Sequence, residues 1–319
     1  MKLFLSITFM TIFIALGVGY VSLVFKVEDI IIQNFVNSFE NLKNRGVNVD
    51  YKIEKGDFSF IPNILIKDLR ISKVKSDEIN AFEVPEILVE LNPFQKYPVK
   101  LTFKNNIKFL SFDRELDFIF KKAFLEISFY KGYKVKDLKI VANDISINES
   151  VENLSFVNHL VANFSFLNEG HKIEFDANGI ALRNEKVDGI YFKAVLNKSL
   201  DFSISFNRIF NEFYSKGGFI FIEKGGFSWL PLKISFDGEI VLNDSLNILV
   251  SLNSNIYGFN DGINMLEEKG FISQKENWLS KIVLFVMARK DDDGEDFIPT
   301  KINYNNKQIF VGPILFYEF

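Results

Sequence analysis

The chain has 319 residues, of which 48% are hydrophobic and 24% are charged, with 37 Phe, 2 His and no Cys. This composition excludes a disordered tail, and the missing thiols exclude a disulfide-stapled module, a zinc-thiolate site and a cysteine nucleophile. The net charge of −4, without a basic block, argues against nucleic acid as the main partner. The length fits one large β domain or two smaller ones.

The N-terminus carries an uncharged apolar segment. Residues Leu3 to Phe25 include no charged side chain, and a helix of this length rises roughly 35 Å, enough to cross a bilayer with some tilt. Lys2 precedes the segment, whereas Glu28 and Asp29 follow closely after it, which favours an N-terminus in the cytoplasm. We therefore predict an N-terminal transmembrane anchor over 1–26, with the rest of the chain outside the cytoplasm.

A cleaved signal peptide is the alternative interpretation of this segment. Signal peptides have a shorter apolar region, roughly 7 to 15 residues, followed by a site with small residues at defined positions. No such site follows Phe25. The pattern favours an uncleaved, single-pass anchor.

An amphipathic helix is predicted directly after the anchor, over 27–46. Apolar residues recur at helical spacing from Ile32 to Leu42, Lys43 lies where a helix C-terminus favours cations, and Gly46 can provide a left-handed cap. This helix could lie on a membrane surface or pack against the following domain.

From Val47 onward the hydrophobic period changes to two, so residues 47–319 are predicted to form one extracytoplasmic β-rich domain. Alternation of apolar and polar residues indicates strands with one apolar face, in a mostly antiparallel sheet. The segments with this pattern include 99–104, 172–177, 200–206 and 230–237. Expected turns lie at Lys131-Gly132, Asn168 to Gly170, Asn178-Gly179, Asp237-Gly238 and Asn243-Asp244.

Three short helices are predicted within the β region, at 207–216, 260–269 and 274–289. The last is the best marked, because Ser273 and Glu276 have the spacing of a capping box. Its apolar stripe, which includes Trp278 and Phe285, is interpreted as part of the core. The predicted fold class is mainly β: an N-terminal transmembrane helix followed by an elongated, curved, mostly antiparallel β domain with a few short helices.

The sequence contains few residues that could form a catalytic or metal-binding pattern. The acidic run from Asp291 to Asp296 fails the EF-hand pattern, because Arg289 and Thr300 would occupy positions that require acidic ligands. His159 and His171 have no neighbours that complete a metal or triad signature. We therefore predict a non-catalytic protein with no cofactor, no metal and no catalytic residue.

Several short segments resemble an uncharacterised bacterial envelope family known as domain-of-unknown-function family 2125. They are the stretch Gly56 to Phe60, in which Ser59 replaces a proline, the run Tyr214 to Phe221 with Gly217-Gly218, the segment Gly238 to Ile272, and the terminal stretch Pro299 to Phe319, in which Asn306 replaces a turn glycine. The resemblance implies a single-pass inner-membrane protein with a periplasmic β domain. More loosely, the layout is similar to AsmA-like envelope proteins, whose grooves are thought to carry lipids.

Two functions follow as expectations. In the first, apolar strand faces bind or handle lipid acyl chains, with the candidate surface at Phe202, Phe206, Phe221 and Phe236. In the second, the same residues pack in a closed core, and the protein is an anchored structural or interaction adaptor that binds another envelope protein. The partners expected are the lipid bilayer, lipid acyl chains or an envelope protein.

Overall fold

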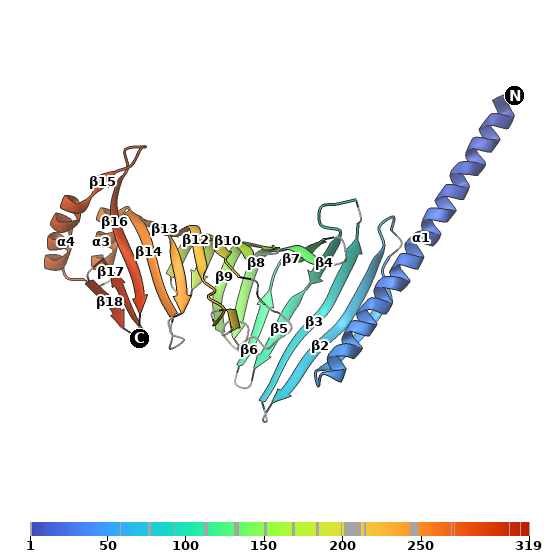
Figure 1. The fold of residues 1–319 in the computed structure, drawn as a ribbon, viewed down its shortest axis with the longest axis horizontal. Coiled ribbons are helices and arrows are strands. Elements are labelled where there is room, and N and C mark those ends of the chain that lie inside the picture. Colours follow the sequence, from blue (N-terminus) through green and yellow to red (C-terminus); the bar gives the residue numbers. More distant parts are fainter. Residues whose placement is uncertain are drawn as a thin grey trace. The chain divides into compact units, whose positions relative to one another are not determined.

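The structure is a computed structural model (Figure 1). It describes residues 2–319 except 58, 76–77, 93, 112–113, 131–133, 150–151, 168–169, 183–184, 199, 201–211, 214, 243–247, 269, 271, 306, 313 and 319. For residues 2–21, for 279 and beside several of the gaps, it describes the backbone alone. The fold is mainly β, as predicted, with antiparallel strand pairs.

Helix α1 runs without a break from Lys2 to Asn44, so the predicted anchor and the predicted amphipathic helix are one continuous element. It ends as predicted, because Gly46 has a φ of 78° and the carbonyl of Leu42 accepts from Val47 N at 3.2 Å. Phe39 is buried, and Phe35 and Leu42 pack against the same cluster of sheet residues. The amphipathic part therefore packs against the β region.

The chain divides into two compact units, Met1–Tyr133 with Ala142–Leu154, and Lys134–Val141 with Ser155–Phe319. The interval predicted as a single domain, 47–319, contributes to both. The strands of the first unit are β1 (Asn48–Lys55), β2 (Asn63–Lys75), β3 (Glu78–Leu91), β4 (Val99–Lys104), β5 (Asn106–Ser111), β6 (Arg114–Ile119) and β7 (Lys122–Phe129). The next strand, β8 (Val135–Glu149), is shared between the two units.

In the first unit, β1, β2 and β3 pair in sequence order. The long strand β3 then has two partners: its C-terminal half pairs with β4, and its N-terminal half pairs with β5. Strand β4 pairs with β7, β5 with β6, and β6 with the end of β8. The sheet thus continues beyond β3 along two neighbouring paths.

Interruptions of the strand pleat line up across this sheet. Asp68 of β2 has a φ of 51° and lies opposite Pro85, which has no N–H to donate. Asn105, with a φ of 70°, separates β4 from β5, and Asp144 of β8 has a φ of 51°. Asn and Asp tolerate this left-handed conformation better than other side chains, and interruptions of this kind bend strands and increase their twist.

The second unit contains a meander of antiparallel strands in the order β9–β10–β11–β12–β13–β14–β16–β17–β18. Its strands are β9 (Glu152–Phe166), β10 (His171–Leu182), β11 (Glu185–Leu196), β12 (Ile220–Trp229), β13 (Leu232–Leu242), β14 (Ile248–Tyr257), β15 (Arg289–Lys290), β16 (Asp296–Asn305), β17 (Gln308–Val311) and β18 (Ile314–Glu318). The two-residue strand β15 pairs with the start of β16.

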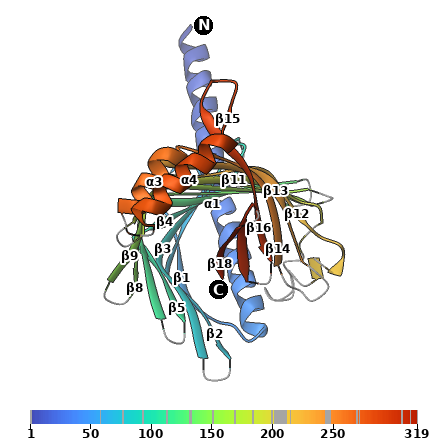
Figure 2. The same ribbon diagram turned by 90° about the vertical axis from the view of Figure 1, so that its left-hand side faces the viewer.

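Helices α3 (Phe259–Glu268) and α4 (Gln274–Met287) lie between β14 and β15 in the chain and pack against each other (Figure 2). Both occur where the sequence predicts them, and the capping box of Ser273 and Glu276 is present. The prediction that the apolar stripe of α4 is core is wrong. Trp278 and Phe285 are 63% and 74% exposed, because α4 packs against α3 through another face that includes the buried Asn277.

Two predicted turns lie inside strands instead. Gly179 is within β10 and Gly238 is within β13. Both have positive φ, and a side chain at either would collide with a neighbouring strand: a Cβ on Gly238 would lie 2.1 Å from the carbonyl oxygen of Ser251. These glycines therefore permit close strand approach rather than chain reversal. The predicted helix 207–216 and the turns at 131–132 and 243–244 fall largely or wholly outside the described residues.

Among residues whose side chains the structure describes, which begin at Ser22 in α1, no helix is long and apolar enough to cross a membrane. Most of the predicted span, Leu3 to Phe25, lies outside that part of the chain.

Candidate functional site

The first unit has a sheet with one apolar face, and part of that face is covered by α1. Ile64 and Ile66 of β2 lie directly opposite Val89 and Ile87 of β3. All four are at most 4% exposed, and Phe39 of α1 belongs to the same buried cluster. This part of the face is an ordinary helix-on-sheet core.

The same apolar face continues past β3, where the burial changes. Leu101 of β4 lies opposite Val89 and, on its other side, opposite Leu125 of β7. Phe109 of β5 lies opposite Phe82 and is 41% exposed. The main contacts of α1 are with β1 and β2. The side chains that continue the face are half-buried, except for the exposed Phe109, and the first four in the list that follows also pack against the buried cluster. They are Val99, Leu101, Phe103, Ile107, Phe109, Leu116, Phe118, Leu125 and Ile127. We call this set the open apolar face.

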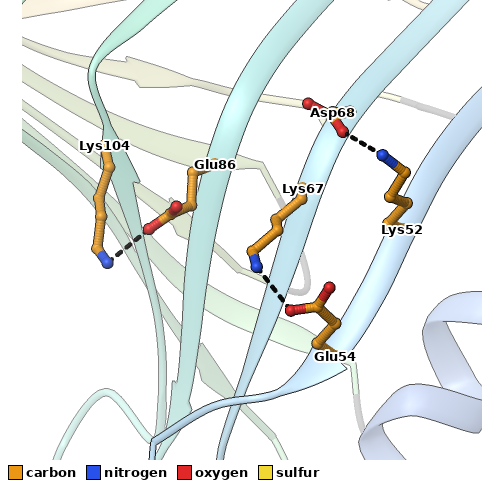
Figure 3. A network of polar contacts seen from close by, with 6 residues as sticks. All are labelled: Lys52, Glu54, Lys67, Asp68, Glu86 and Lys104. Atoms are coloured by element: carbon orange, nitrogen blue, oxygen red, sulfur yellow. Dashed lines mark hydrogen bonds and ion pairs between the residues drawn. The ribbon is translucent and has the colours of Figure 1, made fainter.

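The opposite face of the first unit is charged. Lys67 donates to Glu54 at 2.6 Å, Lys52 to Asp68 at 2.9 Å, and Lys104 lies 2.5 Å from Glu86 (Figure 3). The hydrogen bond with Glu54 raises the pKa of Lys67. These side chains come from four neighbouring strands, so the sheet separates an exposed, ion-paired face from an apolar one.

Of the four predicted aromatic residues, the structure describes Phe221 and Phe236, and these two do not lie on one surface. Phe202 and Phe206 lie outside the described residues. Phe221 of β12 is 44% exposed and lies opposite Glu239. Phe236 of β13 lies opposite Gly225, on the other face of the sheet, because a register shift separates the two pairs and side chains alternate along β13. The sequence pattern did not reveal the open apolar face, because its residues are spread over four short strands.

Phe236 instead joins an aromatic row in the second unit. Phe175, Phe192, Gly225 and Phe236 lie in register on four neighbouring strands, and the first two rings stack with centroids 5.3 Å apart. A Cβ on Gly225 would lie 2.1 Å from the ring of Phe236. The glycine therefore leaves the space that this ring occupies.

A groove of about 430 Å³ lies in the second unit. It runs across β10 to β13, where Asp176, Tyr191, Gly226 and Ser235 are in register, and it reaches the loop that holds Asp291. Its lining contains no histidine. The described part of the groove therefore offers hydroxyl, carboxylate and amine groups.

Two of the candidates for chemistry, His171 and Asp291, have structural roles. Nε2 of His171 accepts from Leu200 N at 2.8 Å, and burial lowers the pKa of this imidazole. Asp291 accepts from the backbone N–H groups of Asp293 and Glu295, which forms a tight turn from the acidic run. Within the described part of the chain, no three His, Asp or Glu side chains are grouped as metal ligands would be.

Comparisons of this chain with protein families, with curated proteins and with solved structures find no match.

Proposed function

We propose that this protein is a membrane-anchored envelope protein that binds lipid acyl chains on the open apolar face of its first unit. The observation that carries the proposal is the change in burial along one face. Val89, beneath the helix-covered part, is 2% exposed, whereas Phe109 farther along the face is 41% exposed. A closed core would bury the middle of such a face, as α1 does over β1 and β2.

The chemistry of the face suits acyl chains. The side chains of the open apolar face are aliphatic or aromatic, without a charge, and they cover adjacent strands rather than single positions. Contiguous exposed apolar surface beyond a few hundred Å² is uncommon on soluble domains and marks a binding surface. The charged residues lie on the opposite face of the sheet (Figure 3).

The uncharged segment Leu3 to Phe25 supports a place at the inner membrane, with the N-terminus in the cytoplasm and the bulk of the chain in the periplasm. Helix α1 is continuous from Lys2 into the part that packs on β1 and β2. An anchor in this helix would hold the sheet directly at a source of lipid. The resemblance to the envelope family and to AsmA-like proteins agrees with this proposal.

The proposal assigns no catalysis to the protein. The histidine with a described hydrogen bond, His171, is occupied by a backbone N–H, and the carboxylates of the charged face are paired with lysines. The role of the face is then to hold apolar ligand, and its specificity rests on shape and length rather than on reacting groups.

Mass spectrometry of the full-length protein, purified in a mild detergent, tests the proposal. We expect co-purifying lipid, and we expect Leu101→Glu to remove most of it, because a carboxylate in an apolar face opposes acyl-chain binding. The matched control is Thr102→Glu, one residue along β4 and on the opposite face. That variant should keep its lipid.

Circular dichroism of both variants separates lost binding from lost folding. Since a buried charge can unfold a sheet, Leu125→Ser on the facing strand β7 provides a milder second change. Wild-type protein without lipid, or folded Leu101→Glu with as much lipid as wild type, would contradict acyl-chain binding and would favour the closed-core adaptor.

A further inference from the structure

Helix α4 packs against the protein through its polar side, whereas the amphipathic helices of soluble proteins usually pack through their apolar side. Its inward side carries Asn277, which is 4% exposed and donates to Asn264 of α3 at 3.2 Å and also to Glu267. Lys281 on the same side donates to Asn264 at 2.5 Å. The polar side of the helix is therefore the one fixed to the protein.

The outward side of α4 is apolar. Four side chains at spacing i, i+4, i+7 and i+8 form a single stripe, and two more widen it. Their exposed fractions are Trp278 63%, Ile282 46%, Phe285 74% and Val286 80%, with Val283 56% and Met287 47%. We call these six residues the α4 face.

The α4 face is larger than chance exposure explains. An aromatic side chain carries roughly 150–250 Å², so the exposed parts of Trp278 and Phe285 amount to roughly 250 Å² before the four other side chains are added. Monomeric soluble proteins rarely leave a contiguous apolar patch of more than a few hundred Å² without a binding role. We therefore expect the α4 face to be covered by another molecule.

We propose that the α4 face inserts into the headgroup and acyl-chain boundary of a lipid bilayer. Amphipathic helices that bind bilayers lie in this plane with their apolar side buried by roughly 5–10 Å. The face contains a tryptophan, a residue favoured at membrane interfaces, and no charge. Lys275 near its start and Arg289 just beyond its end have stems long enough to keep their charges in water.

The size of the face favours a bilayer over a second copy of the chain. A helix of 14 residues is about 21 Å long, and one side of it falls short of the roughly 800 Å² per partner that stable protein interfaces bury. A bilayer requires no matching surface. The acidic run from Asp291 follows the cations closely in the chain, so we expect apolar burial, and not attraction to anionic lipid, to drive insertion.

This inference goes beyond the proposed function, because α4 belongs to the second unit and is separate in sequence from the open apolar face. The chain has two tryptophans, Trp229 and Trp278. In a Trp229→Phe background, Trp278 is then the only indole, and it reports on α4 in the full-length protein. Trp229 packs beside the small cluster around Ile180 and Val187, where phenylalanine conserves the apolar ring.

The experiment places the full-length Trp229→Phe protein in liposomes of uncharged phosphatidylcholine with brominated acyl chains. We expect Trp278 emission to shift to shorter wavelength and to be quenched about twofold or more relative to unbrominated liposomes, as for a ring at the acyl boundary. Phe285→Ser with Val286→Ser should remove most of the quenching. Phe94→Ser, which removes a 90% exposed phenylalanine from a loop of the first unit, should not change it.

Emission typical of water, unchanged by brominated lipid, would overturn the proposal. A shift to shorter wavelength that depends on protein concentration and not on bromine would also overturn it, because a second copy would then cover the face. These outcomes do not depend on lipid bound to the first unit. Failure here and failure of acyl-chain binding by Leu101 and its neighbours can therefore be told apart.

Discussion

The backbone N–H of Asn63 in β2 donates a hydrogen bond to the carboxylate of Glu28 in α1 over 3.2 Å, and both residues are almost fully buried. The side-chain amide of Asn63 also donates to the carbonyls of Asp57 and Ile61, each at 3.1 Å. Asn63 therefore fixes the loop before β2 and the helix that covers β2. This contact positions α1 over one part of the apolar face and leaves the rest uncovered.

Removal of the buried carboxylate should loosen that contact. Glu28→Ala leaves the N–H of Asn63 buried without its acceptor, and we expect a loss of about 1–3 kcal/mol in the free energy of unfolding. Asp29→Ala is the matched control, because Asp29 makes a surface ion pair with Lys55 at 2.8 Å, and such pairs contribute about 0–1 kcal/mol. Urea unfolding of the full-length protein in detergent measures both. Equal losses would contradict the role assigned to Glu28.

Substitution of Gly225 should destabilise the protein, because the ring of Phe236 occupies the space beside it. Gly225→Ala would place a Cβ 2.1 Å from the ring of Phe236, and crowding of this kind costs about 1–3 kcal/mol. In a Phe236→Ala background the space is free, so the same glycine change should cost much less. Thermal or urea unfolding of the wild type, the two single variants and the double variant gives the coupling energy between Gly225 and Phe236. Additive effects would show that the ring does not cause the constraint.

His171 should make stability depend on pH. Burial lowers its pKa in the folded protein below the ordinary value of 6.5, so the unfolded chain binds the proton more readily. The stability that this neutral imidazole provides is complete above pH 6.5 and is lost as the pH falls from there toward the folded pKa. Unfolding midpoints between pH 8 and pH 5 should fall more in wild type than in His171→Gln. Parallel profiles would contradict the assignment.

The absence of cysteine from the chain allows a direct test of topology. Phe94→Cys places a thiol at a position that is 90% exposed, and we expect an impermeant maleimide to label it in spheroplasts without lysis. Lys2→Cys should be labelled only after the cells are lysed, because the proposed orientation keeps this residue in the cytoplasm. The reverse pattern, or a mature chain that begins near residue 25, would contradict the anchor.

Local patterns were good guides to where elements lie. The capping box at Ser273, the left-handed Gly46 and the alternation over 99–104 each predicted an element that the structure contains. These signals depend on neighbouring residues, so the sequence holds them completely. Glycine after Asn or Asp was a poorer guide, because Gly179 and Gly238 serve close strand approach within long strands.

What covers each element was not predictable. The helical period of α4 is the same whether its apolar stripe faces the sheet or water, and the deciding contact is the polar one between Asn277 and Asn264. Likewise, alternation in β4 and β7 shows that one face is apolar, but the reach of α1 decides which part of that face is open. The pleat interruptions at Asp68, Asn105 and Asp144 depend on the alignment of strands far apart in the chain.

If acyl chains occupy the open apolar face of the first unit, they must lie against the side chains of β4 and β7. The most direct measurement is photo-crosslinking of a phosphatidylcholine with a diazirine at mid-chain to the full-length protein, followed by peptide mapping. We expect crosslinks on the β4 and β7 residues of that face, such as Leu101 and Leu125, and not on the neighbouring Lys100 and Glu126 of the opposite face. Crosslinks confined to residues 3–25, or spread equally over both faces of the sheet, would contradict it.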